Sequence, residues 1–282
     1  MAREKFEDGW LELDGLRIHY TEWGSPSKPP VLMLHGLNVQ CHTWDPIAAD
    51  LAKDYRVIAM DMRGHGDSDW SPAGYRVHSM ARDVHGLIDA LALAPVRLVG
   101  HSAGVRVAIA VAGEKPETVS HLALSDAGPA NSASGAVAMR EFIQATTNLR
   151  GFRNEQEARE FYLGFHPEWR EDFIDLHVKH QLRRNWAGKL VPKADPDVQW
   201  ITGSVSLPDV AYLWEMSERL TMPTRLLVGR RSNVLDEPVV QKMLDAMPNS
   251  TVSWFDTGHY VPREAPDEFT SVLVDFLASD LK

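Results

Sequence analysis

The stretch Gly-His-Ser-Ala-Gly at residues 100–104 decides the fold expected for this chain. It follows the short apolar run of residues 96–99 and precedes a second apolar run, residues 105–112. Glycine on each side of Ser102 lets a strand and a helix approach closely, and it tolerates a strained backbone at the serine. Such a turn lifts the serine oxygen above the edge of a sheet, where it can act as a nucleophile. The stretch therefore predicts a nucleophilic serine between a strand and a helix.

The regions on both sides of this turn alternate between strand and helix patterns. An Asp-Gly turn at residues 14–15 joins two expected strands into a hairpin. Short, continuously apolar runs are typical of strands buried on both faces, and residues 76–91 carry apolar side chains at helical spacing. The expected strands are residues 10–13, 16–23, 31–34, 56–60, 96–99, 119–125, 224–228 and 251–255. This order predicts an α/β fold with a mostly parallel, eight-stranded sheet and helices on both faces.

The alternation stops in the middle of the chain. Between residue 127 and about residue 220 the sequence holds helical patterns and tryptophans but no convincing strand. The expected helices there are residues 139–148, 155–165, 171–184 and 208–220. We therefore expect a core formed by residues 1–126 and 221–282, interrupted by a helical cap of residues 127–220.

The composition argues against several classes of partner and compartment. The 282 residues carry a net charge of −10, so neither a nucleic acid nor an anionic membrane is expected as a partner. Cys41 is the only cysteine, which rules out an intramolecular disulfide and fits a reducing compartment. The N-terminal residues are too charged for a signal peptide, and no apolar run approaches the roughly 20 residues of a membrane span. We expect a cytoplasmic protein, and a homodimer is compatible with the sequence.

Four loops that follow predicted strands are rich in glycine and polar residues. They are residues 35–38, 61–68, 100–104 and 258–262, which read HGLN, DMRGHGDS, GHSAG and GHYVP. Open α/β sheets bind their ligands at the carboxyl ends of strands, where these loops are expected. The set resembles the α/β-hydrolase fold superfamily, specifically its small members with a cap, over nearly the whole chain. Because this fold supports many chemistries, the resemblance is specific for the fold and much less so for the substrate.

The resemblance implies roles for particular residues. Ser102 matches the nucleophile, and His259 matches the general base that takes the serine proton and later returns it to the leaving group. The backbone N–H groups of Leu37 and Ala103 match an oxyanion hole. The serine also separates this chain from the epoxide hydrolase and dehalogenase branches of the superfamily, whose nucleophile is an aspartate.

The carboxylate that should orient His259 is the open question. In the superfamily it usually follows strand seven, but the matching position here holds Asn233, which is neutral. Asp126 is the favoured alternative, because it follows a strand that is expected beside the serine strand. Asp236 is a third candidate, although its place before Glu-Pro is typical of a helix N-cap. A weakened or inactive site with Asn233 in the acid position also stays open.

Aromatic residues of the cap are more numerous than a small cap can bury in its own core. Some of them are expected to line a cleft below the cap and to form an apolar or aromatic pocket. Candidates for this pocket are Trp186 and Trp214, together with Tyr260 beside the histidine.

These features favour a serine hydrolase that needs no cofactor. The leading hypothesis is cleavage of a medium-sized, apolar or aromatic ester or lactone through an acyl-enzyme at Ser102. Two alternatives are a carbon–carbon bond hydrolase of ring-cleavage products and a ligand-binding protein on a hydrolase scaffold. The loop of residues 61–68 is interpreted as structural, with Arg63 and Asp67 tying neighbouring loops together. No metal site is expected, because the twelve histidines show no converging ligand spacing.

Overall fold

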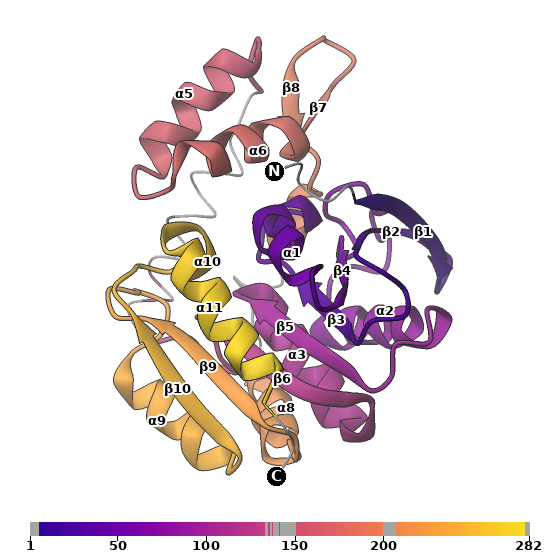
Figure 1. Ribbon diagram of the computed structural model, residues 1–282. Coiled ribbons are helices and arrows are strands. Elements are labelled where there is room, and N and C mark those ends of the chain that lie inside the picture. Colours follow the sequence, from indigo (N-terminus) through magenta and orange to yellow (C-terminus); the bar gives the residue numbers. More distant parts are fainter. Residues whose placement is uncertain are drawn as a thin grey trace.

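An eight-stranded sheet forms the centre of the molecule. The computed structural model describes residues 6–132, 135, 137, 141, 151–199 and 207–279. The strands follow the order β1-β2-β4-β3-β5-β6-β9-β10 across the sheet (Figure 1). β1 and β2 form an antiparallel hairpin whose second strand also pairs antiparallel with β4, and all the other pairs are parallel. The predicted fold class, a mostly parallel sheet with helices, is therefore confirmed.

The bounds of the elements agree closely with the apolar runs of the sequence. The strands of the sheet are β1 (Glu7–Leu13), β2 (Leu16–Trp23), β3 (Pro30–Leu34), β4 (Arg56–Met60), β5 (Val96–His101), β6 (Val119–Ser125), β9 (Thr224–Gly229) and β10 (Ser250–Phe255). The helices next to them are α1 (Asp45–Leu51), α2 (Val77–Ala90), α3 (Ala103–Glu114), α8 (Leu207–Glu218), α9 (Glu237–Ala246), α10 (Val261–Glu264) and α11 (Pro266–Leu277). Short 3-10 turns are η1 (Cys41–Trp44), η2 (Pro116–Thr118) and η3 (Pro196–Gln199).

Both faces of the sheet are buried, which explains the continuous apolar runs. In β3, Leu32 and Leu34 belong to one hydrophobic cluster, whereas Val31 and Met33 belong to a second cluster. Successive side chains of a strand point to opposite faces, so each cluster fills one side of the sheet. The first cluster includes apolar residues of α2, α3, α8 and α9, and the second includes those of α1 and α11. The central strands such as β3 and β4 therefore need apolar residues at nearly every position rather than at alternate ones.

The part of the chain between β6 and β9 contains a hairpin that the sequence did not indicate. It forms α5 (Glu155–Phe165), α6 (Glu171–Gln181) and the antiparallel pair β7 (Leu182–Arg184) and β8 (Leu190–Pro192), drawn above the sheet in Figure 1. No strand was expected between residues 127 and 220, and that expectation was wrong for residues 182–192; the helix expected to reach residue 184 ends at Gln181. Strands of three residues are too short for a recognisable alternation. The helix expected at residues 139–148 lies outside the described residues, apart from residue 141.

Helix α8 packs on the core although its sequence falls in the range expected for the cap. Leu213 and Met216 are buried in the same cluster as α2 and α3. Gly113 of α3 lies so close to α8 that an added Cβ would approach the backbone of Met216 to 2.6 Å. This helix therefore contributes to the layer that covers the sheet.

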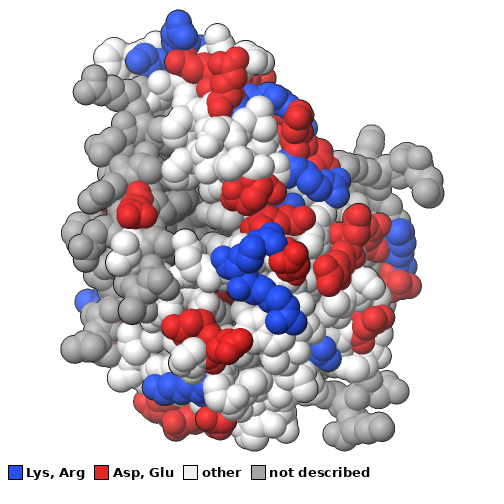
Figure 2. Space-filling view, turned by 90° about the vertical axis from the view of Figure 1, so that its left-hand side faces the viewer, with Lys and Arg blue, Asp and Glu red and all other residues white. Residues whose placement is uncertain are grey.

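The surface and the helices give two further observations. Acidic and basic side chains are interspersed on the face of the molecule drawn in Figure 2. Among the described residues, no helix combines the length and the apolar character needed to cross a membrane.

The close contact between α3 and β3 gives a prediction about stability. A Cβ on Gly104 would lie 2.5 Å from the carbonyl oxygen of Leu34 and 2.7 Å from that of His35, and both are backbone atoms. Gly104→Ala should therefore lower the free energy of unfolding by about 3 kcal/mol, measured by urea titration. The matched control is Gly164→Ala in α5, where a Cβ would meet no atom within 4 Å. That variant should be neutral or more stable by up to about 1 kcal/mol, and an equal loss in both variants would contradict the packing argument.

Candidate active site

Ser102 lies at a strained turn between β5 and α3. Its backbone angles are φ 54° and ψ −117°, a conformation that residues other than glycine rarely adopt. Its N–H donates to the carbonyl oxygen of Ser125 in β6, at 3.0 Å, which holds the turn against the neighbouring strand. The glycine on the helix side allows α3 to begin directly above β3. The stretch of residues 100–104 thus forms the strand-turn-helix geometry that the sequence predicted.

A chain of hydrogen bonds joins Ser102, His259 and Asp126. His259 lies in the loop between β10 and α10, and its Nε2 is 2.9 Å from the Ser102 hydroxyl oxygen. Its Nδ1 is 2.7 Å from Oδ2 of Asp126. Because a carboxylate only accepts, Nδ1 carries the proton, which leaves Nε2 as the acceptor for the serine O–H. The three residues come from the ends of β5, β6 and β10, so the sheet itself brings them together.

Asp126 is held by the loop in which the sequence pattern would place the acid. Its side chain is fully buried, and it follows β6 with a positive φ of 53°. One carboxylate oxygen accepts the N–H of Gly229 at 2.9 Å, and the other accepts the hydroxyl of Ser232 at 2.5 Å. Both donors belong to the end of β9 and its following loop. That loop therefore supplies hydrogen bonds to the carboxylate instead of supplying the carboxylate.

The two alternative acid positions have other surroundings. Asn233 lines the same cavity as Ser102 and His259, and its backbone carbonyl oxygen accepts a hydrogen bond from the hydroxyl of Ser132 at 3.3 Å. Asp236 is the N-cap of α9, where its carboxylate accepts the N–H of Val239 at 3.0 Å. The structure thus places Asp126, and not Asp236, at the histidine. The capping interpretation of Asp236 agrees with its geometry.

The residues expected to form the oxyanion hole lie on either side of the serine. Leu37 follows β3 and lines the same cavity as Ser102. Ala103 is the first residue of α3, in the turn of a helix whose N–H groups have no acceptor within the helix. Gly36 packs closely on the serine, because a Cβ there would lie 3.1 Å from the Cβ of Ser102.

Two adjoining chambers open above Ser102. The serine chamber, about 180 Å³, is lined by Gly36, Leu37, Val39, His101, Ser102, Phe165, His166, Asn233, Val234, His259, Tyr260 and Arg263. The outer chamber, about 260 Å³, is lined by Leu37, Asn38, Val39, Trp70, Tyr162, Phe165, His166, Trp169, His177, Gln181, Arg183, Val191, Pro192, Ala194, Asp195, Pro196 and Tyr260. Five of these residues line both chambers, so the two adjoin each other beneath α5, α6 and the β7–β8 hairpin.

Of the three residues predicted to line the pocket, one does so and two do not. Tyr260 lines both chambers, as expected. Trp186 does not: it lies in the turn between β7 and β8, and 98% of it is exposed. Trp214 on α8 packs against the core cluster, with the Lys242 ammonium 4.0 Å from its ring centroid, and it lines neither chamber. Composition identified an aromatic cap but gave no sign of which side each ring faces.

Several lining residues were not singled out from the sequence. His166 stacks on Trp169 at a centroid distance of 3.8 Å, and Tyr260 meets both rings edge-on. Burial, together with the positive charge of Arg263, lowers the pKa of His177 well below its ordinary value. Burial also lowers the pKa of His166, with a smaller contribution from Arg263 in the same direction. Both rings are therefore neutral at neutral pH. His166 follows the last residue of α5, where a helix face could not be assigned from periodicity.

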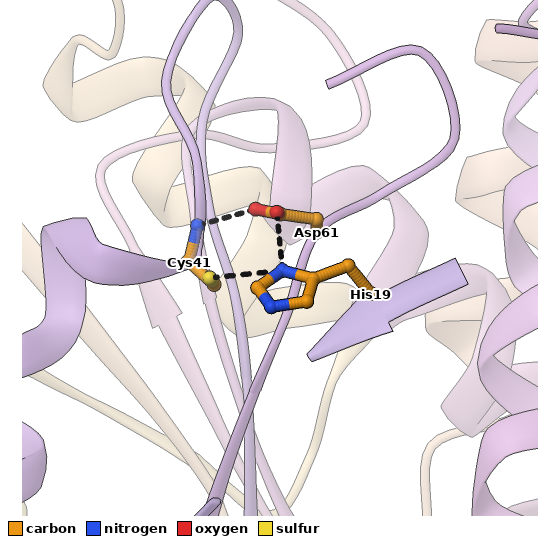
Figure 3. A group of neighbouring side chains, drawn as sticks. All are labelled: His19, Cys41 and Asp61. Atoms are coloured by element: carbon orange, nitrogen blue, oxygen red, sulfur yellow. Dashed lines mark hydrogen bonds and ion pairs between the residues drawn. The ribbon is translucent and has the colours of Figure 1, made fainter. Parts of the chain in front are cut away.

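Two groups of side chains have the spacing of a metal site among the described residues. In the first, drawn in Figure 3, the Asp61 carboxylate accepts the N–H of Cys41 at 2.6 Å and contacts Nδ1 of His19 at 2.8 Å. It also accepts the N–H of Asp67, and the other nitrogen of His19 is 3.0 Å from Asp8. Burial alone would raise the pKa of Asp61, but the hydrogen bond and charge of His19 lower it well below its usual range. These atoms already satisfy one another without an ion.

The second group is His42, Asp45 and His180. Nδ1 of His42 is 3.0 Å from the Asp45 carboxylate, and the His42 ring stacks on His180 at a centroid distance of 3.7 Å. Nitrogen lone pairs lie in the ring plane, so stacked imidazoles do not point at a common ion. The interaction instead joins α6 to η1 on the core.

The loop of residues 61–68 has the structural role expected of it. The Arg63 guanidinium donates two hydrogen bonds of 2.6 Å to the buried Asp83 carboxylate in α2. Asp67 forms an ion pair with Lys193, which follows β8, at 2.7 Å. Both interactions tie this loop to neighbouring elements, and neither residue lines the serine chamber.

Comparison with known proteins agrees with this arrangement. The family model described as alpha/beta hydrolase fold matches residues 29–266. A 2-(acetamidomethylene)succinate hydrolase of Mesorhizobium japonicum is 24% identical over 278 residues, which cover 98% of this chain and 97% of that protein. A soluble epoxide hydrolase of Corynebacterium is 25% identical over 288 residues, 94% of this chain and 95% of the relative.

Solved structures show the same fold. A crystal structure of E-2-(acetamidomethylene)succinate hydrolase has a TM-score of 0.89 at 23% identity, covering 98% of this chain and 100% of that one. The enol-lactonase of Burkholderia xenovorans has a TM-score of 0.73 at 22% identity, covering 96% and 100%.

The Asp61 network gives a prediction about stability and pH. In Asp61→Asn, an amide replaces the carboxylate that accepts hydrogen bonds from the N–H groups of Cys41 and Asp67. This loss should lower the free energy of unfolding by about 3 kcal/mol at pH 5.5. The lowered pKa of Asp61 makes its contribution available above about pH 4. Burial alone would lower the pKa of His19, but its interactions with Asp61 outweigh burial and raise this pKa. The contribution of protonated His19 to the free energy of unfolding is therefore complete below about pH 6.5 and declines above that pH. The difference between wild type and variant should therefore be largest between these two limits.

Urea unfolding from pH 3 to pH 9 measures this difference. The control is Asp50→Asn, which removes an exposed pair with Lys53 and should change stability by less than about 0.5 kcal/mol. A wild-type melting temperature that rises on addition of Zn²⁺ would contradict the hydrogen-bonded interpretation of the cluster in Figure 3.

Proposed function

The chain belongs to the α/β-hydrolase fold family, and from this membership we propose that it is a serine hydrolase that cleaves an ester or lactone without a cofactor. The observation that carries the proposal is the unbroken chain from the Ser102 hydroxyl through His259 to the buried Asp126. The strained backbone at the serine supports it, because such strain is typical of functional sites. The hydrolases among its relatives agree with the general class of reaction.

In the proposed reaction, His259 accepts the Ser102 proton while the serine oxygen attacks the substrate carbonyl. The N–H groups of Leu37 and Ala103 stabilise the negative charge that develops on the carbonyl oxygen. His259 then gives its proton to the leaving alkoxide, and the C–O bond breaks to leave an acyl-enzyme. A water molecule loses a proton to His259, attacks the acyl carbon and releases the acid as Ser102 recovers its proton. Asp126 keeps the histidine in one tautomer and stabilises its protonated form.

The nature of the nucleophile and the acid narrows the alternatives. A serine forms an acyl ester, which favours carboxylic acid derivatives over the epoxide that the Corynebacterium relative is named for. The ligand-binding alternative was raised by Asn233 in the acid position, and the hydrogen bond between Asp126 and His259 supports the enzyme instead. Carbon–carbon bond cleavage uses the same three residues and stays an untested prediction.

The acid assignment predicts a strong asymmetry between two variants. Asp126→Asn should lower kcat for a p-nitrophenyl ester by about 10⁴-fold, as expected when the histidine loses its orienting carboxylate. Asn233→Asp should change kcat little, because the ring nitrogen is already occupied by Asp126. Asp236→Asn, which affects only the cap of α9, is the control and should leave kcat unchanged. A large gain from Asn233→Asp would remove Asp126 from the proposed mechanism.

Covalent labelling tests the nucleophile directly. A fluorophosphonate should modify Ser102 with a stoichiometry of one, located by peptide mass spectrometry, and it should not modify Ser102→Ala. A burst of p-nitrophenol before the steady state would identify the acyl-enzyme. Ligand binding without labelling would instead favour a binding protein on this fold.

A further inference from the structure

We propose that the substrate carries a carboxylate, which binds beside Arg183 and Gln181 in the outer chamber while the scissile carbonyl lies at Ser102. The inference rests on the proposed hydrolase function and names its substrate class. It also changes the expectation of a purely apolar pocket.

Arg183 lies on β7 at the outer chamber, and its guanidinium lies over the ring of Trp70, 5.2 Å from the ring centroid. Stacking uses the flat face of the guanidinium and leaves its N–H groups pointing outward along the edge. Among the residues that the structure describes, no carboxylate forms an ion pair with Arg183. Trp70 therefore holds an arginine at the wall of the chamber whose charge-assisted hydrogen bonds can be made by a ligand.

Gln181 lies two residues before Arg183, at the end of α6, and lines the same chamber. Only 1% of the residue is exposed, yet neither the oxygen nor the nitrogen of its amide has a hydrogen-bond partner in the described part of the chain. Buried amides are rarely left in this state, because each unpaired group loses its hydration without compensation. A ligand oxygen that accepts from the Gln181 amide would remove this cost.

The walls of the serine chamber add a second positive charge. Arg263 on α10 is 4% exposed, and its guanidinium lies 3.9 Å from the ring centroid of Trp169. It donates to the hydroxyl of Thr43 at 2.5 and 3.0 Å, whereas its Nη1 has no hydrogen-bond partner among the residues that the structure describes. No described carboxylate forms an ion pair with it. Burial lowers the pKa of Arg263 to about 10, so the group remains charged at neutral pH.

The balance of charge favours one negative group on the ligand. Among the described residues that line either chamber, Asp195 is the only carboxylate, and it accepts hydrogen bonds from the Tyr75 hydroxyl and from the N–H of Asp197. Two arginines, Arg183 and Arg263, face it on the described walls, and burial lowers the pKa of His166 and of His177. The Glu168 carboxylate lies 3.2 Å from Nδ1 of His166 but lines neither chamber. Arg263 is buried and Arg183 is exposed, and a cleft whose walls carry an excess of one sign of charge attracts ligands of the opposite sign.

The position of these groups determines where the carboxylate lies on the substrate. Arg183 and Gln181 line the outer chamber only, whereas Ser102 lines the serine chamber only. Between them are apolar walls that include Phe165 and Tyr260. The substrate class is therefore an ester or lactone with an apolar segment between the scissile carbonyl and a distal carboxylate.

A matched pair of esters tests the proposal. p-Nitrophenyl valerate and the mono-p-nitrophenyl ester of glutaric acid have similar length and differ in a terminal methyl or carboxylate. The wild type should have a kcat/KM about tenfold higher for the glutarate ester. Arg183→Gln should remove this preference, measured as the ratio of kcat/KM for the two esters, and Arg183→Lys should retain part of it. Arg153→Gln, on an exposed arginine outside both chambers, is the control.

A binding measurement separates this proposal from the hydrolase proposal. Calorimetry on Ser102→Ala compares 4-phenylbutyrate with neutral 4-phenylbutanamide, and the acid should bind at least about fivefold more tightly unless Arg183 is changed to Gln. Gln181→Leu should reduce the same preference and raise the melting temperature, because it removes an unpaired buried amide.

Each outcome decides one of the two proposals. If neither ester is hydrolysed but the acid binds through Arg183, the hydrolase function fails and the carboxylate site stands. If both esters are hydrolysed equally and the acid shows no advantage in binding, the carboxylate site is overturned and the hydrolase stands. Failure of the acid to bind at all also overturns the carboxylate site.

Discussion

The hydrogen bond between the buried Asp126 carboxylate and His259 is the interaction on which the rest of the site depends. A fully buried carboxylate is unfavourable unless each oxygen has partners, and here the partners come from two other segments of the chain. Gly229 and Ser232 hold it from the end of β9, and His259 meets it from the loop after β10. Asp126 acts on Ser102 only through His259, which is hydrogen-bonded to both residues. The position of one carboxylate therefore coordinates three strand ends into a single reactive arrangement.

Much of this arrangement could be predicted from the sequence, because glycines and apolar runs have strong local meaning. Glycines around Ser102 identify a turn that other residues cannot form, since added Cβ atoms would collide with backbone. Buried parallel strands require apolar side chains on both faces, which makes their runs easy to recognise. The carboxylate partner of His259 was harder to predict. The loops after β6 and β9 both follow neighbouring strands, and their sequences do not show which of them reaches the histidine.

Other features depend on tertiary contacts that no local pattern contains. The β7–β8 hairpin has strands of three residues, and a turn at Asn185 to Lys189 holds it together. Trp186 lies at that turn and faces away from the protein, whereas Trp169 lies under His166 and next to Arg263. Both are tryptophans in a helix-rich segment, so composition alone treats them alike. Only the packing of the segment against α10 separates a lining residue from an exposed one.

The loop after β9 donates a hydrogen bond to the Asp126 carboxylate and also forms part of the wall of the serine chamber. Asp126 follows β6, and its carboxylate accepts the backbone N–H of Gly229 at the end of β9 and the hydroxyl of Ser232 in the loop after it. Position 229 requires glycine, because a Cβ there would lie 2.1 Å from the carbonyl oxygen of Gly258. Asn233 of the same loop lines the serine chamber, while Asp126 holds the ring nitrogen of His259. A substitution at position 233 would therefore change the wall of the chamber and leave the carboxylate at the histidine in place.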